Sequence, residues 1–257
     1  MSKPLILLTN DDGVAAKGLA ALVEMVKPYG RVVVVAPEAA NSGMSHAITV
    51  DQPLRLRAVK VDEDVAIYAC TGTPADCVKM AMSHVVSDTP DLIVSGINHG
   101  SNSSISVVYS GTLGAASEGC LYNIPSVGFS LLSHRSDADF SASIHFGQRI
   151  IEKVLANKPA SRTYLNVNIP NLPIGEMKGI KLCRQTSGVY REEYEKRTDP
   201  HGQEYYWLTG TFINEEPAAT DTDEYALAQG YVAVVPLHPD MTAYSELDRM
   251  RKQWVTE

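Results

Sequence analysis

The stretch from Leu5 to Gly13 constrains the fold of this chain more than any other part of its sequence. A short apolar run, Leu5–Thr9, is followed at once by an asparagine, two adjacent aspartates and a glycine. Apolar runs of this length between turn residues are typical of strands buried on both faces of a sheet. Asp and Gly favour turns, so the strand cannot continue through them. Open α/β sheets bind ligands at the carboxyl ends of their strands, where Asp11 and Asp12 would lie.

The residues that follow predict a second strand parallel to the first. Apolar side chains at helical spacing over residues 17–27 predict a helix, which Pro28 and Gly30 end. The valine-rich segment 31–36 predicts another buried strand. Strand, helix and strand in this order form a βαβ unit, in which the crossover is right-handed and the strands are parallel.

Similar patterns extend this α/β organisation along the chain. We expect further strands at residues 48–61 and 65–69, as an edge hairpin, and at 91–95, 126–130, 164–168 and 231–236. We expect helices after Thr73, after Ser110, and at 140–155, 223–229 and 244–254. Residues 178–211 are charged and aromatic, which predicts β-hairpins projecting from the sheet. The terminal helix carries an apolar stripe that needs a surface to cover, on its own core or on a neighbouring subunit.

Composition limits the classes of protein to consider. The chain has 257 residues, of which 44% are hydrophobic, enough for one large core. A formal net charge of −8 argues against a nucleic-acid-binding surface. The four cysteines form no paired motif, so we expect reduced core cysteines of a cytoplasmic protein. We expect no signal peptide, and no apolar run approaches the roughly 18 residues that would span a membrane.

Oxygen-bearing side chains follow three of the expected strands. Asp11 and Asp12 follow the first, Ser42 lies in the loop after the second, and Asn98 follows the strand at 91–95. Adjacent carboxylates repel each other, and a divalent cation would relieve that repulsion. These hard oxygen ligands suit Mg²⁺ or Mn²⁺, whereas no His or Cys cluster favours zinc. The alternative is a solvated acidic turn, with Ser42 in an ordinary flexible loop.

The segment Ser110-Gly111-Thr112 comes directly before an expected helix and after a long polar loop. The free N–H groups and positive dipole of a helix N-terminus, together with two hydroxyls, form an anion site. The alternative is an ordinary N-cap, for which Ser and Thr are preferred anyway. The chain has no Walker A or dinucleotide-binding glycine motif. A metal site beside an anion site indicates hydrolysis of a phosphate ester.

Several motifs together resemble the SurE family, the stationary-phase survival proteins, which are metal-dependent nucleoside monophosphate phosphatases. The resemblance runs nearly end to end and rests on motifs in the family's order. They are TNDDG at residues 9–13, Lys17-Gly18, the loop from Ala36-Pro37 to Ser42-Gly43, GTPADCV at 72–78, SGINHGSN at 95–102, YSGT at 109–112, LNVNIP at 165–170, and TD followed by GYVAVVPL near the end.

The resemblance implies roles for individual residues. It implies one divalent cation per subunit, Mg²⁺ or Mn²⁺, bound by Asp11, Asp12, Ser42 and Asn98. It implies that Asn102 and Ser110-Gly111-Thr112 hold the substrate phosphate, and we expect Asn10 to contribute there. Asp11 and Asn102 are the expected catalytic residues; whether Asp11 acts as ligand, base or nucleophile stays open. We favour direct attack by water, because both aspartates are expected to be committed to the metal.

The resemblance also implies an overall architecture. It implies a Rossmann-like, mostly parallel sheet flanked by helices, with protruding β-hairpins and a C-terminal segment exchanged between subunits of a homodimer or homotetramer. We expect a single α/β domain with its core at about 1–170 and 223–236, a hairpin extension at about 178–211, and a C-terminal arm at about 237–257. Three departures from the family pattern, Glu38, Ala39-Ala40-Asn41 and Ser106, concern base preference and loop closure.

The expected function is therefore release of phosphate from nucleoside 5′-monophosphates, with 3′-monophosphates as further substrates, by metal-activated water. Besides further copies of the chain, the expected partner is this small molecule, with no nucleic acid and no membrane. A different class of protein, a nucleotide-binding sensor without turnover, would keep the same binding groups. A hydrolase of polyphosphate or of phosphomonoesters in general is the enzymatic alternative.

Overall fold

The computed structural model describes residues 3–191 and 193–254, and these form an α/β fold around one large sheet. The sheet has nine strands in the order β3-β4-β2-β1-β5-β6-β7-β13-β8. The strands β4, β2, β1, β5, β6 and β7 run parallel, while β3 and β13 run antiparallel to their neighbours in this group. Their bounds are β1 Leu5–Thr9, β2 Arg31–Pro37, β3 Leu56–Val61, β4 Val65–Cys70, β5 Leu92–His99, β6 Ser126–Leu131, β7 Tyr164–Ile169, β8 Gly179–Leu182 and β13 Tyr231–Leu237.

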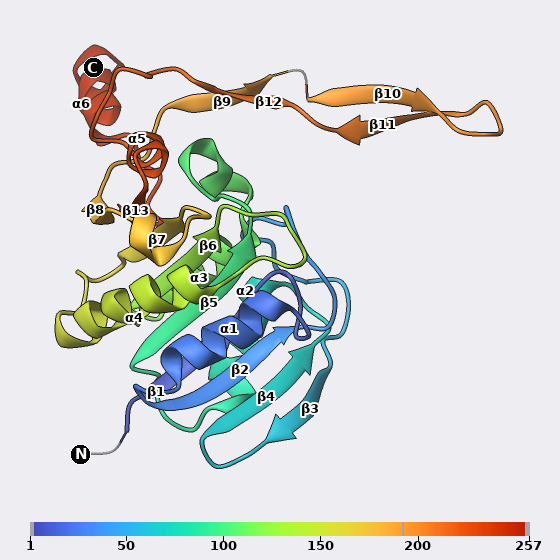
Figure 1. Ribbon diagram of the computed structural model, residues 1–257, viewed down its shortest axis with the longest axis vertical. Helices are drawn as coiled ribbons and strands as arrows, with labels where there is room; N and C mark the ends of the chain where they lie inside the picture. The colour runs from blue at the N-terminus through green and yellow to red at the C-terminus, as the bar shows by residue number, and fades with distance from the viewer. Residues whose placement is uncertain (1–2, 192, 255–257) are drawn as a thin grey trace.

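Helices cover both faces of this sheet (Figure 1). Helices α1, Lys17–Val26, and α4, Ser141–Ala156, pack side by side on one face, where Leu22, Met25 and Ile151 are fully buried. Helices α2, Pro74–Met80, and α3, Gly111–Leu121, cover the other face. The expected α/β class and mostly parallel sheet are thus confirmed, because apolar strands between two helical layers bury both of their faces.

Local sequence signals placed several helix ends correctly. Thr73 caps α2 through its hydroxyl, which accepts from Asp76 N at 3.1 Å, and the Asp76 carboxylate accepts in return from Thr73 N at 3.0 Å. This reciprocal pair is a capping box, which satisfies two helix N–H groups that would otherwise lack partners. Ser110 caps α3 through its hydroxyl oxygen, which accepts from Leu113 N at 3.2 Å.

The region that we expected to project from the sheet divides into two parts. Strand β8 does not project: it pairs in parallel with β13 and forms the edge of the main sheet. The expected edge hairpin at 48–61 is also shorter, since its first strand begins at Leu56. Hydropathy alone does not reveal these differences, because edge strands are half exposed and resemble hairpin strands.

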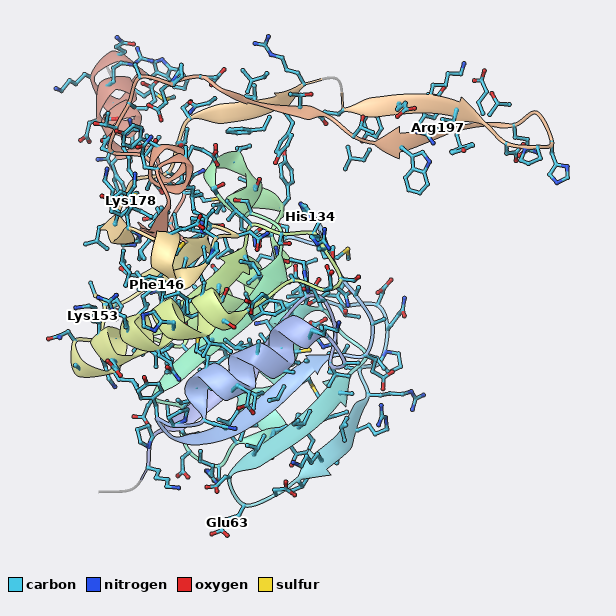
Figure 2. The ribbon with its side chains drawn as sticks, in the orientation of Figure 1. Glu63, His134, Phe146, Lys153, Lys178 and Arg197 are labelled. Carbon is cyan, nitrogen blue, oxygen red and sulfur yellow. The ribbon has the colours of Figure 1, made fainter. Side chains whose placement is uncertain are left out.

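The projecting part is a long, narrow arm made of two short antiparallel ladders (Figure 1). Next to the core, β9, Gly188–Arg191, pairs with β12, Thr211–Asn214; beyond them, β10, Tyr194–Thr198, pairs with β11, Glu204–Leu208. We call residues 188–191 and 193–214 the arm. All side chains of β10 and β11 are exposed, and Arg197 lies on the part of the arm remote from the core (Figure 2).

The C-terminal part returns to the sheet and then leaves it. Helix α5, Asp223–Ala228, begins at the Thr222 cap and packs on Ala233 and Val235 of β13. The terminal helix α6, Tyr244–Trp254, has no buried residue. Tyr244 and Trp254 of its apolar stripe are exposed while Leu247 and Met250 are half-buried, so the described part of the chain covers the stripe only in part. None of the described helices combines the length and the apolar character needed to cross a membrane.

Candidate active site

The acidic turn after β1 is shaped by Asn10. Its Oδ1 accepts from Gly13 N at 3.2 Å and its Nδ2 donates to Gly13 O at 3.0 Å, so both ends of the amide close the turn. Gly13 has a φ of +100°, which residues with a side chain rarely adopt. Asn10 therefore serves the shape of the turn, and its expected contact with phosphate stays a prediction.

Asp11 is buried at the end of β1, with 3% of its surface exposed. Thr112 Oγ1 donates to its Oδ1 at 2.5 Å. Burial raises the pKa of Asp11 to about 6, and the charge of Asp12 adds to this rise against the opposing effect of the Thr112 hydrogen bond. Burial also raises the pKa of Asp12, although the backbone N–H of His99 donates to its Oδ2 at 3.4 Å.

These two carboxylates lack a permanent cation. Neither forms an ion pair with a Lys or Arg among residues 3–191 and 193–254. The same residues contain no group of three or more His, Cys, Asp or Glu side chains arranged to hold a metal. A cation bound here would therefore need neutral oxygen ligands beside the two carboxylates, which fits Mg²⁺ or Mn²⁺ better than zinc.

Neutral oxygens come from two neighbouring strand ends. The Nδ2 group of Asn98 donates to Gly100 O at 2.9 Å, so Oδ1 is the atom that remains for a cation. The loop carrying Ser42 lies against the acidic turn, because Asn41 N donates to Asp11 O at 2.7 Å. The structure thus gathers the four expected metal ligands at the carboxyl edge of the sheet, while metal binding itself stays a prediction.

Helix α3 begins directly against Asp11. A Cβ at Gly111 would lie 2.9 Å from the Cβ of Asp11, so only glycine allows the helix N-terminus to approach this closely. Thr112 is fully buried and directs its hydroxyl to Asp11. Ser110 caps the helix and also lines the adjacent pocket. The positive end of α3 is therefore aimed at the acidic turn, as an anion site beside a metal site requires.

Asn102 is held by an amide network that the sequence motifs did not explain. Its backbone N–H donates to Asn168 Oδ1 at 2.8 Å, and its backbone oxygen accepts from Asn166 Nδ2 at 2.8 Å. Its side-chain Nδ2 donates to Ser130 Oγ at 2.9 Å. The two asparagines belong to the LNVNIP motif on β7, and their alternation on one face of a strand is the signal that could have identified them.

Five of the expected residues meet in one pocket of about 570 Å³, and the arm supplies part of its wall. Asn10, Asp12, Gly111 and Thr112 are absent from the described lining and lie behind or beside Asp11. Sequence reasoning missed the two histidines and all the arm residues in this wall. The described lining consists of Asp11, Ser42, Gly43, Asn98, His99, Asn102, Ser106, Tyr109, Ser110, His134, Tyr190, Glu193, Tyr194, Leu208 and Thr209.

His99 belongs to the Asn98–Gly100 segment, and His134 packs on it. The ring of His99 packs edge-to-face on Phe140, with ring centroids 5.3 Å apart. The ring of His134 covers Gly100 so closely that a Cβ there would lie 2.2 Å from it, and it faces the space beneath the arm (Figure 2). Both rings border the pocket, and neither was singled out by its sequence context.

Comparisons with known proteins agree with this arrangement. Residues 6–192 match the family described as Survival protein SurE. A protein of Phocaeicola vulgatus named 5′-nucleotidase SurE is 48% identical over 99% of this chain and 98% of its own length. A protein of Christiangramia forsetii with the same name is 52% identical over 94% of each chain. The crystal structure of the SurE protein from Aquifex aeolicus superposes with a TM-score of 0.83, at 41% identity, and covers 97% of this chain and 99% of its own.

The family match spans most of the chain, and these relatives align along nearly its whole length. The acidic turn, the Asn98–Asn102 loop and the start of α3 all lie within the matched residues. The motifs that suggested a family therefore belong to one continuous similarity. This chain is a member of the SurE family.

Proposed function

We propose that this protein is a metal-dependent 5′-nucleotidase that releases phosphate from nucleoside 5′-monophosphates. The relatives named above are called 5′-nucleotidase SurE, which supports the reaction class. The observation that carries the proposal is the position of Asp11. Its buried carboxylate, which has no cationic partner in the described chain, contacts the N-terminus of α3 and borders the pocket beside Ser42 and Asn98.

Different residues in and beside the pocket would carry the separate parts of the reaction. Asp11, Asp12, Ser42 and Asn98 would hold the cation, Mg²⁺ or Mn²⁺. Such a cation polarises a phosphoryl oxygen and lowers the pKa of water. Because both aspartates are committed to the cation, we favour water as the nucleophile over Asp11.

The phosphate itself would be bound on the other side of Asp11. Asn102, Ser110 and the first N–H groups of α3 donate hydrogen bonds, which stabilise negative charge on the transferring group. These donors are held by the Asn166–Asn168 network and by the helix, so they need no rearrangement during the reaction.

The cellular setting follows from the cysteines. All four cysteines are buried and free in the described chain. Unpaired cysteines are typical of reducing compartments, so we propose that the enzyme acts in the cytoplasm.

The decisive experiment measures phosphate release from a panel of nucleoside 5′- and 3′-monophosphates, with Mg²⁺, with Mn²⁺ and after chelation. We expect metal-dependent release from the 5′-monophosphates and test the 3′-monophosphates as a second class. Asp11→Asn and Asp12→Asn should each abolish release while the circular dichroism spectrum stays that of the wild type. Polyphosphate and a simple phosphomonoester belong in the same panel, because preferential turnover of either would favour a more general hydrolase.

The same panel separates the enzyme from a nucleotide sensor. A sensor would bind nucleoside monophosphates, measured by calorimetry, without releasing phosphate under any of the metal conditions. Tight binding without turnover in the wild-type protein would therefore overturn the proposed activity.

A further inference from the structure

The wall of the pocket opposite the acidic turn belongs to the arm. Tyr190 from β9, Tyr194 from β10 and Leu208 from β11 line the same pocket as Asp11 and Asn102. Tyr194 and Leu208 lie directly opposite each other in the β10–β11 ladder and are 67% and 68% exposed. Two large apolar side chains therefore remain uncovered beside a polar site.

Tyr190 connects this wall to the loop that carries the expected phosphate donors. Its hydroxyl lies 3.0 Å from Ser106 Oγ, in the 3-10 turn Ser104–Tyr109 that leads into α3. Its ring packs edge-to-face on Phe212 of β12, with centroids 5.7 Å apart. The ring of Tyr190 is thus fixed at the inner end of the arm.

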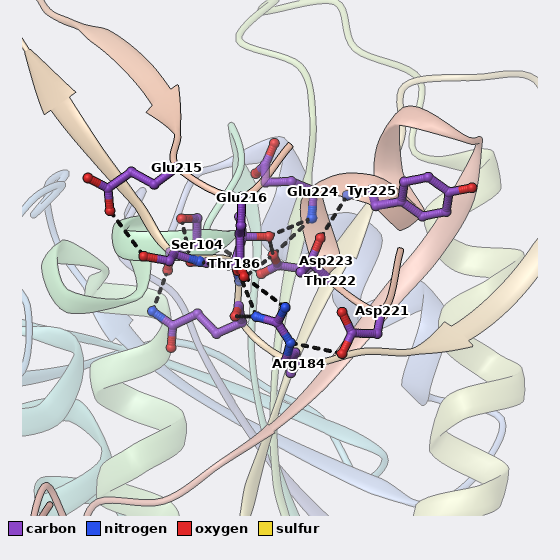
Figure 3. A network of polar contacts seen from close by, with 12 residues as sticks. Ser104, Arg184, Thr186, Glu215, Glu216, Asp221, Thr222, Asp223, Glu224 and Tyr225 are labelled. Carbon is purple, nitrogen blue, oxygen red and sulfur yellow. Dashed lines mark hydrogen bonds and ion pairs between the residues drawn. The ribbon is translucent and has the colours of Figure 1, made fainter. Parts of the chain in front are cut away.

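The segment that leads into the arm at Thr186 is hydrogen-bonded to Asp223, which also bonds the same loop and has a fully buried carboxylate (Figure 3). Its Oδ2 accepts from Ser104 N at 2.9 Å, and its Oδ1 accepts from Thr186 N at 3.0 Å and from Thr186 Oγ1 at 2.5 Å. Ser104 is two residues from Asn102, and Thr186 is two residues before β9. Asp223 therefore joins the arm to the loop at the phosphate end of the pocket, in addition to the contact of Tyr190 with Ser106.

The pocket consequently has two chemically different ends. Donors and carboxylates stand at one end, and aromatic and aliphatic surfaces stand at the other. Its volume of about 570 Å³ lies in the range of pockets that enclose an organic ligand rather than a bare phosphate ion. Aromatic side chains bind nucleobases by stacking, which contributes substantially for every base because each presents a π-face.

We propose that Tyr190, Tyr194 and Leu208 of the arm form the nucleoside subsite, with Tyr194 as its main stacking surface. This inference rests on the proposed function and adds the residues that recognise the base. Stacking tolerates any base, so the subsite should favour substrates that carry a nucleobase and discriminate weakly among bases.

The test uses two substrates that differ only in the base. Adenosine 5′-monophosphate and ribose 5-phosphate share the sugar and the phosphate ester, so the ratio of their kcat/KM values reports recognition of the base. We expect Tyr194→Ala to lower this ratio about tenfold, mainly through the KM of the nucleotide, and Tyr194→Phe to restore it. The side chain is mostly exposed, so neither change disturbs a packed core.

Tyr206→Ala is the matched control. Tyr206 is an exposed tyrosine of β11, two residues from Leu208, and lies outside the described pocket lining. The Tyr206→Ala variant should keep the wild-type ratio of the two kcat/KM values. An unchanged ratio in both Tyr194→Ala and Tyr190→Ala, or an equal fall in kcat/KM for both substrates, would overturn the nucleoside subsite.

Failure of the proposed function would look different. If the wild-type protein releases phosphate from neither substrate, the activity is wrong, and calorimetry then decides on the subsite. Adenosine 5′-monophosphate should bind more weakly to Tyr194→Ala than to the wild type, while inorganic phosphate binds both equally. Equal nucleotide affinities in that experiment would overturn the subsite independently of catalysis.

Discussion

Asp11 carries a charge at a position where burial opposes it. Its pKa in the folded protein is about 6, against 3.8 for an ordinary aspartate. The folded metal-free protein therefore retains a proton at pH values where the unfolded chain has already lost it. Stability from this proton is fully present below pH 3.8 and is lost as the pH rises through about 6. A difference of this size corresponds to about 3 kcal/mol of unfolding free energy.

This linkage predicts a measurable pH dependence. With a chelator present, the free energy of unfolding from urea titrations should fall between pH 4 and pH 7, and Asp11→Asn should remove much of that fall. Asp11→Asn should also be more stable than the wild type at pH 7, because it removes a charge that burial and, to a lesser degree, the charge of Asp12 oppose. Asp51→Asn, which changes an exposed carboxylate, is the control and should keep the wild-type slope. A pH profile of Asp11→Asn that runs parallel to that of the wild type would contradict the assignment.

The neighbouring donors should separate into two kinds of variant. Asn102→Ala removes a side-chain donor that we propose binds the phosphate, so kcat should fall roughly a hundredfold while the metal concentration for half-maximal activity stays constant. Thr112→Ala removes the hydrogen bond that lowers the pKa of Asp11, so protons compete better with the metal and that concentration should rise. Thr112→Ser, which keeps the hydroxyl, should recover the wild-type value. If Asn102→Ala instead raised the metal concentration for half-maximal activity and Thr112→Ala lowered only kcat, the two residues would have each other's role.

At the scale of elements, the connection between the arm and the core depends on a few buried polar contacts. Asp223 accepts hydrogen bonds from the loop after β5, from Thr186 just before β9 and from the start of α5. Arg184 adds ion pairs to Glu216 at 2.6 Å and to Asp221 at 2.9 Å on the exposed side of the same junction (Figure 3). The buried contacts carry most of the stability, because exposed ion pairs are screened by water.

Asp223→Asn tests this division. The new amide places an NH₂ group against a backbone or side-chain donor, and one buried donor loses its acceptor at a cost of about 1–3 kcal/mol. We expect a lower urea midpoint and a higher KM for nucleoside monophosphates. Asp221→Asn, two residues earlier and exposed, should change both quantities little. Similar losses in the two variants would show that the junction does not depend on its buried carboxylate.

Much of the fold could be predicted from the sequence because its signals are local. The run before Asn10, the capping box at Thr73 and the cap at Ser110 each depend on residues close together in the chain. The pairing of β8 with β13 and the contact of Asn102 with Asn168 depend on residues far apart. No periodicity encodes such contacts. For the same reason, the sequence indicated the phosphate end of the pocket and left the arm wall unpredicted.

At the scale of the whole molecule, the terminal helix α6 is an element that packs little on its own subunit. Trp254 is 73% exposed and Tyr244 is 62% exposed, so α6 buries little apolar surface in its own subunit. Burial of a large apolar side chain stabilises a protein by roughly 1.5–3 kcal/mol. Pro236 still lies within β13, and Pro239 stiffens the segment between β13 and α6, which favours an extended exit from the sheet. We therefore propose a homodimer or homotetramer in which this segment packs on a neighbouring subunit.

Truncation tests the proposed exchange. Deleting residues 240–257 should give monomers or aggregates on a sizing column, since the partner surface would lose its cover. Tyr244→Ala combined with Trp254→Ala should weaken the assembly in the same direction without shortening the chain. An intact oligomer with full activity after truncation would show that α6 does not hold the subunits together.

The narrow arm has a consequence for how such an enzyme can change over generations. Its outer strands contribute no buried side chain, so substitutions there cost little folding stability. Most of the residues that would carry out the chemistry, Asp11, Asn98, Asn102 and Ser110, are buried at strand ends and beside the start of α3, where most substitutions are costly. Mutations can therefore explore new choices of substrate on the arm while the reacting groups stay under strict constraint.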